Sequence, residues 1–180
     1  MIGGQTVIKK ETLNFKVTRT VGLISDTHVP KRAMCIPEKV FEIFANVDYI
    51  IHAGDLVELA VVDELEKIAP VLAVHGNMDG IEVAGAFPRL NSLKVFDWKI
   101  GITHDPNILY GFNKMSETAL MNGFNVFVYG HTHVADIKWE DKILYVNPGS
   151  PTDPSSPLVK PSVGLLKVTK EAVVPEITYF

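Results

Sequence analysis

The sequence predicts an α/β fold, and three observations lead to this prediction. Short apolar runs alternate with helix-sized amphipathic segments in the first half of the chain, which is the βαβαβ pattern of a parallel sheet. Further short apolar runs, separated by turn residues, make the second half rich in strands. The length of 180 residues suits a single domain. We therefore expect both halves of residues 1–180 to share one core.

The individual elements follow from apolar runs and from helical spacing. We expect strands in the first half at 21–25, 47–52 and 71–75, with helices at 37–46 and 58–68. Pro37 suits the first helical position, and Pro70 ends the second helix. In the second half we expect a helix at 114–122 and strands at 93–98, 100–104, 126–129, 135–139, 143–146, 163–168 and 172–179. Residues 1–17 are either an extra edge strand or a loose extension.

The composition excludes several classes of protein. A hydrophobic content of 47% with 21% charged residues excludes a disordered protein. The net charge of −4 argues against nucleic acid as a partner. The single cysteine, Cys35, excludes a disulfide framework and suits a reducing compartment. No apolar run approaches 18 residues and residues 1–10 lack a signal-like core, so we expect a cytoplasmic protein with no membrane partner.

Nearly every predicted core strand ends in residues that can bind metal. The strand-end motifs are Asp26-Thr27-His28, Gly54-Asp55, Gly76-Asn77-Met78-Asp79, His104-Asp105 and Gly130-His131-Thr132-His133. Ligands of open α/β sheets bind beyond the carboxyl ends of the strands. Asp, Asn and His supply oxygen and imidazole donors to divalent ions. Most of these motifs alone are typical of a turn, and Gly130-His131-Thr132-His133 alone fits a turn or a metal site equally well, but five in succession indicate a metal centre.

Asp26 with His28, and His131 with His133, are metal-ligand types two residues apart. In an extended chain, side chains at this spacing point the same way. We therefore expect each pair to converge on one locus.

Together with Asn147-Pro148-Gly149-Ser150, these motifs resemble the calcineurin-like metallophosphoesterases, in particular their small single-domain phosphodiesterase branch. The resemblance implies a four-layer α/β/β/α sandwich, the metallo-dependent phosphatase-like fold, with two divalent metal ions at its rim. We expect manganese, with iron, nickel, cobalt and zinc as alternatives.

The resemblance also implies a ligand set of seven residues. One ion is expected to bind Asp26, His28 and His133, the other Asn77, His104 and His131, and Asp55 is expected to bridge them. Asp55, Asn77 and His104 are the expected catalytic residues. A shared carboxylate sets two ions about 3.5–4 Å apart, and the pair activates a bridging hydroxide for in-line attack on phosphorus.

The expected function is therefore hydrolysis of a small phosphoester, a diester in the first place. The alternative is a protein-binding scaffold, because the chain also resembles a retromer subunit of this fold that has lost part of the ligand set. All seven ligands are present here, which favours catalysis. A homodimer formed through the strand edge at 163–180 is a further expectation.

Residues beside the ligands leave alternatives open. Met78 stands where many relatives carry a histidine, and a thioether cannot donate a proton to a leaving group. We expect either a preference for good leaving groups or proton supply through water. His52 and His75 are expected to be hydrogen-bonded structural histidines, with support of Asp55 or Asn77 as the alternative.

Overall fold

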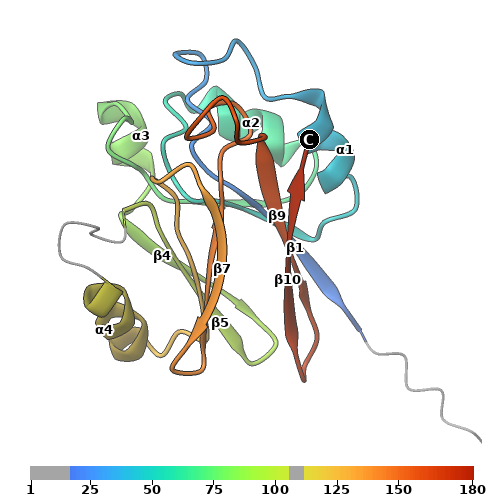
Figure 1. Ribbon diagram of the computed structural model, residues 1–180, viewed down its shortest axis with the longest axis vertical. Coiled ribbons are helices and arrows are strands. Elements are labelled where there is room, and N and C mark those ends of the chain that lie inside the picture. Colours follow the sequence, from blue (N-terminus) through green and yellow to red (C-terminus); the bar gives the residue numbers. More distant parts are fainter. Residues whose placement is uncertain (1–16, 106–111) are drawn as a thin grey trace, which may run out of the picture.

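The computed structural model describes residues 17–105 and 112–180 and contains two five-stranded sheets packed face to face (Figure 1). The first sheet has the order β10-β9-β1-β2-β3. Its strands are, in that order, Val173–Tyr179, Ser162–Val168, Arg19–Ile24, Tyr49–His52 and Val71–Ala73. The second sheet has the order β4-β5-β6-β8-β7. Its strands are, in that order, Leu90–Val95, Trp98–Thr103, Val126–Val128, Ile143–Pro148 and Ala135–Glu140.

Helices cover the outer faces of both sheets. Helices α1 (Glu38–Phe44) and α2 (Ala60–Glu66) pack against the first sheet. Helix α4 (Phe112–Asn122) packs against the second sheet, at the lower left of Figure 1. The layers therefore run helix, sheet, sheet, helix. This confirms the α/β class and the four-layer sandwich expected from the sequence.

Successive side chains of the central strands point alternately into the core between the sheets and into the core beneath the helices. Val21 and Leu23 of β1 are fully buried in the cluster between the sheets, whereas Ile24 is buried in the cluster beneath α1 and α2. Ile51 and Ile50 of β2 divide in the same way. Because both faces of these strands are buried, their sequences read as continuous apolar runs.

The directions of the strands determine where the polar residues that follow them come together. Strands β1, β2 and β3 are parallel, as predicted, and β5, β6 and β8 are parallel in the second sheet. The β9–β10 hairpin returns from the end of the chain and pairs antiparallel with β1. The carboxyl ends of the parallel strands from both sheets lie at one rim of the sandwich.

Two sequence expectations need correction. The sequence did not predict helix α3 (Ile81–Ala86), because only Val83 of this helix is buried and Ile81 is 95% exposed, so no amphipathic pattern is visible. Pro37 occupies the N-cap of α1 rather than its first helical position. The expectation for 1–17 lies outside the described residues except at Val17. Among the described residues, no helix is long and apolar enough to cross a membrane.

Candidate metal centre

The structure brings the predicted site residues together at the rim where the parallel strands end. Loops after β1, β2, β3, β5 and β6 carry them, in chain order Asp26 and His28, Asp55, Asn77, His104, and His131 and His133. These loops bond to one another through the backbone. The amides of Asp26 and His28 donate to the carbonyl oxygens of Gly54 and Asp55, both at 3.0 Å.

Five of these residues have left-handed backbone conformations. The φ angles of Asp26, His28, Asp55, His131 and His133 lie between +46° and +71°. Each such residue costs on the order of 1 kcal/mol, and residues of this kind cluster at functional sites. The expected extended geometry of the two i, i+2 pairs is therefore wrong. Asp26 and His28 do converge, but His131 and His133 face different groups of side chains.

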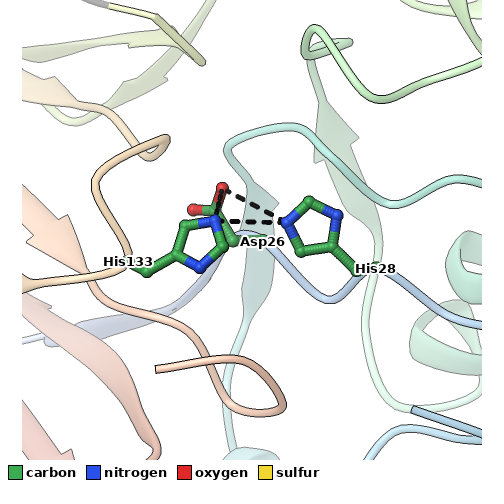
Figure 2. Close-up of side chains that lie close together, drawn as sticks. All are labelled: Asp26, His28 and His133. Carbon is green, nitrogen blue, oxygen red and sulfur yellow. Dashed lines mark hydrogen bonds and ion pairs between the residues drawn. The ribbon is translucent and has the colours of Figure 1, made fainter. Parts of the chain in front are cut away.

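The first group consists of Asp26, His28 and His133 (Figure 2). The two Nε2 atoms of His28 and His133 lie 3.2 Å apart, and they lie 4.0 and 3.3 Å from Asp26 Oδ1. Ligands bonded to one ion at about 2.0–2.2 Å in a tetrahedral arrangement lie roughly 3.5 Å apart. The three side chains can therefore ligate one ion with little movement.

The second group is centred on His104. Its Nε2 lies 3.1 Å from Asn77 Oδ1 and 3.3 Å from Asp55 Oδ2, and Asn77 Oδ1 lies 2.9 Å from His131 Nδ1. The Nδ1 of His104 faces the carbonyl oxygen of Ala53 at 2.8 Å, so it carries a proton. In the neutral ring, Nε2 is then an acceptor that faces two oxygen acceptors. This arrangement requires a cation, either a proton or a metal ion.

Asp55 lies between the two groups. Its Oδ2 is 3.3 Å from His104 Nε2 and 3.8 Å from His28 Nε2, while Oδ1 accepts the amide of Met78 at 2.7 Å. Burial raises the pKa of Asp55, but its bond to His104 and that amide outweigh burial, so the pKa is lowered overall. An ionised carboxylate is thus available to both groups.

The carboxylates of the site and burial together shift the pKa values of its histidines. The pKa of His104 is raised, because its bond to Asp55 and the charge of Asp26 outweigh burial. The pKa of His133 is raised chiefly by its bond to Asp26. Burial lowers the pKa of His28 despite the nearby Asp55. Protons would therefore compete with a metal ion at His104 and His133, and the affinity for such an ion would fall as the pH falls.

Asp79 holds the loops around Asp55 and Asn77. One of its carboxylate oxygens accepts the amides of Asp55 and Gly76 at 3.0 and 2.7 Å, and the other accepts the amide of Val57 at 2.6 Å. A carboxylate with three amide donors fixes these loops to each other.

His52 is a buried structural histidine, as predicted. Its Nδ1 accepts the amide of Gly54, so its Nε2 donates to the hydroxyl of Thr27 at 3.1 Å. Burial lowers its pKa to about 4, and the ring is neutral near neutral pH. It supports the turn that carries Asp55.

The Asn147–Ser150 turn braces the same centre, a role that the sequence did not reveal. Ser150 Oγ donates to the carbonyl of Asp26 at 2.7 Å, and Asn147 Nδ2 bonds the carbonyl of Gly130 at 2.9 Å. Ser25 Oγ donates to Asp26 Oδ2 at 2.6 Å. The motif itself was the available signal, but the bond from Ser150 to Asp26 joins residues 124 positions apart, which a local pattern does not reveal.

Two glycines permit the close approach of the ligand loops. Gly54 has φ +90°, and a Cβ there would lie 2.7 Å from Cβ of His104. A Cβ on Gly76 would lie 2.1 Å from Asp55 Oδ1. Larger residues at either position would displace a site side chain.

Comparison with known proteins identifies the family. Residues 20–171 match the family model described as the calcineurin-like phosphoesterase superfamily domain. The chain belongs to this superfamily. This calcineurin-like phosphoesterase is 40% identical over 161 residues to a probable metallophosphoesterase of Methanothermobacter thermautotrophicus, covering 87% of the chain and 90% of that relative. It is 31% identical over 166 residues to a phosphodiesterase of Methanocaldococcus jannaschii, covering 84% and 94%.

The solved structures agree with the fold of this calcineurin-like phosphoesterase. Vacuolar Protein Sorting 29 from Cryptosporidium parvum superimposes with a TM-score of 0.75 over 91% of this chain and 98% of that chain. Its sequence identity is 23%, so this likeness concerns the fold alone. The family expected from the strand-end motifs is confirmed.

Proposed function

We propose that this chain is a metal-dependent phosphodiesterase that holds two divalent ions, manganese in the first place, bridged by Asp55. One observation carries the proposal. His104 Nε2, Asn77 Oδ1 and Asp55 Oδ2 turn lone pairs toward one another at 3.1 and 3.3 Å. His104 and Asp55 are buried, and an imidazole nitrogen that faces a buried carboxylate oxygen at this distance needs a cation between them. The phosphodiesterase of M. jannaschii, 31% identical, supports diesters as the substrate class.

Two divalent ions at this centre would supply a nucleophile from water at neutral pH and would neutralise the phosphoryl oxygens. The chain itself sets the orientation of the ligands. The Nδ1 atom of His104 faces the carbonyl oxygen of Ala53, and that of His133 faces the carbonyl oxygen of Asp153. In both rings Nε2 is therefore left to bind an ion. Neutral Asn77 limits the negative charge of the centre, so that an anionic diester is not repelled.

The experiment uses metal-stripped protein, added Mn²⁺ and bis(p-nitrophenyl) phosphate, with p-nitrophenyl phosphate as the monoester. We expect diester turnover that depends on the ion and falls roughly 100-fold in Asp55→Asn. Asp63→Asn, on the exposed side of α2, is the matched control and should keep full activity.

The scaffold alternative predicts a different result. If the protein binds divalent ions but hydrolyses neither ester with any of them, the phosphodiesterase proposal is wrong. That result would favour the scaffold alternative, in which the chain binds a protein partner.

A further inference from the structure

A pocket of about 340 Å³ opens directly from the metal centre. Asn77 and His104 belong both to the wall of this pocket and to the second ligand group. The pocket extends from them toward β4 and helix α4, through Leu90, Met115 and Thr118. Figure 1 shows α4 beside the sheet that contains β4 and β5. A molecule held at the metal centre would therefore have one side against this pocket.

The pocket has an apolar floor and a polar edge. Met115 and Phe127 line it and are only 3% and 1% exposed, so the floor belongs to the buried apolar cluster beneath α4. Thr103, Thr118 and Arg89 also line it and supply hydroxyl and guanidinium groups. Pockets of roughly 300–1,000 Å³ with apolar walls and a few polar groups are typical of small-molecule sites.

We propose that this pocket binds one organic group of the diester substrate, and that this group is a neutral ring system with hydrogen-bond acceptors on its edge. The proposal rests on the proposed phosphodiesterase function and adds the substrate class. An alkyl group as small as methyl would leave most of the 340 Å³ empty, whereas an aryl group or a nucleoside would fill it and bury apolar surface against Leu90, which is 37% exposed. The phosphate would remain at Asn77 and His104.

Arg89 is the residue that would bind the acceptors on the edge of the ring. The carbonyl oxygen of Arg89 accepts the hydroxyl of Thr103 at 3.1 Å, which anchors its backbone at the pocket. Within residues 17–105 and 112–180, no hydrogen bond or ion pair engages its guanidinium. Asp105 brings a carboxylate to the same pocket, so a full negative charge on the organic group would gain little. These two charges together favour a neutral group.

Two phosphodiesters of equal charge test the proposal. Diphenyl phosphate and dimethyl phosphate differ only in their organic groups, and titration calorimetry measures their binding to the Mn²⁺-loaded protein. We expect diphenyl phosphate to bind about tenfold more tightly or better, since burial of a ring is favourable. Thr118→Trp fills the pocket without changing a proposed ligand and should abolish this preference, with dimethyl phosphate binding unchanged.

Controls separate the possible failures. Leu120→Trp, on the same helix but 63% exposed and outside the pocket, should keep the preference. Leu90→Trp fills the pocket from β4 and replaces Thr118→Trp if that variant does not fold. Equal affinities for the two diesters, or a preference that survives both pocket-filling variants, would overturn the inference. If the unmodified, Mn²⁺-loaded protein does not hydrolyse bis(p-nitrophenyl) phosphate at all, the proposed function is overturned instead.

Arg89→Met gives a second readout. We expect it to raise KM for bis(p-nitrophenyl) phosphate, whose nitro groups are acceptors, about threefold or more, with kcat little changed. Diphenyl phosphate, which lacks such acceptors, should bind this variant as it binds the unmodified protein. Equal weakening of both ligands would show that Arg89 acts on the phosphate or on the fold instead.

Discussion

The Nδ1 atom of His104 lies 2.8 Å from the carbonyl oxygen of Ala53, and this hydrogen bond joins the end of β5 to the end of β2. It also fixes the tautomer of the ring, so that Nε2 faces Asp55 and Asn77. The two sheets are thus tied together at the point where the lone pairs converge. Occupancy of the metal centre and stability of the sandwich should be linked.

Removal of the metal should therefore destabilise the protein. An ion at 100 times its dissociation constant, bound only by the folded chain, adds about 2.7 kcal/mol to the free energy of unfolding. We expect Mn²⁺ to raise the thermal midpoint of metal-stripped protein and EDTA to reverse the change. Asp55→Asn should show a much smaller shift. A midpoint that does not respond to Mn²⁺ in the unmodified protein would contradict the link.

Asp79→Ala should weaken both stability and activity without removing a proposed ligand. The change leaves the amides of Asp55, Val57 and Gly76 without their carboxylate partner. We expect a loss of about 2 kcal/mol in the free energy of unfolding, measured in urea, because unpaired amides cost on the order of 1–3 kcal/mol each and water reaches some of them. Asp63→Ala, exposed on α2, should change it by less than about 0.5 kcal/mol.

His52 should make the metal-free protein less stable in mild acid. Its folded pKa of about 4 lies below the 6.5 of an unperturbed histidine. Between these values the unfolded chain binds the proton and the folded chain does not, so stability falls as the pH falls through this window. The loss contributed by His52 is about 3 kcal/mol by pH 4.

His52→Leu isolates this contribution from the other histidines. Urea unfolding at several pH values from 7.5 to 4 should give a shallower slope for the variant than for the unmodified protein. The variant is also expected to be less stable at pH 7.5, because the amide of Gly54 loses its acceptor. Parallel slopes would mean that His52 does not stay neutral in the folded protein.

Met78→His should increase turnover of diesters with poor leaving groups. The backbone amide of Met78 donates a hydrogen bond to Asp55, and a substitution keeps this bond. Met78 is 37% exposed, so a histidine side chain can be accommodated there. A general acid commonly contributes roughly 10²–10⁴-fold, so a gain of about tenfold for a methyl ester is a modest expectation. Met34→His, also exposed, is the control. Unchanged turnover of the methyl ester would show that water already supplies the proton.

The fold was predictable because its signals are local. Each core strand is a short apolar run, and burial on both faces explains why β1 and β2 show no alternation. Helix α3 was not predicted, because only one of its residues is buried and its sequence therefore shows no amphipathic pattern. The return of β9 to pair with β1 is a long-range contact that strand patterns do not encode.

The sequence predicted which residues come together at the site, but not the backbone conformations that bring them there. The motifs named the residues that the structure brings together, whereas their roles as ligands remain a prediction. The left-handed backbone of Asp26 and His28 could not be predicted from the sequence, because both residues are hydrogen-bonded to the loop after β2. Ser150 bonds the carbonyl of Asp26 from 124 residues away, which no local pattern reveals.

Anomalous diffraction from crystals grown with Mn²⁺ distinguishes a two-metal centre from a single metal site. We predict two manganese peaks about 3.5–4 Å apart, with Asp55 between them, one beside His28 and one beside His104. A single peak, or two peaks that Asp55 does not bridge, would contradict the two-metal centre from which the phosphodiesterase function is argued.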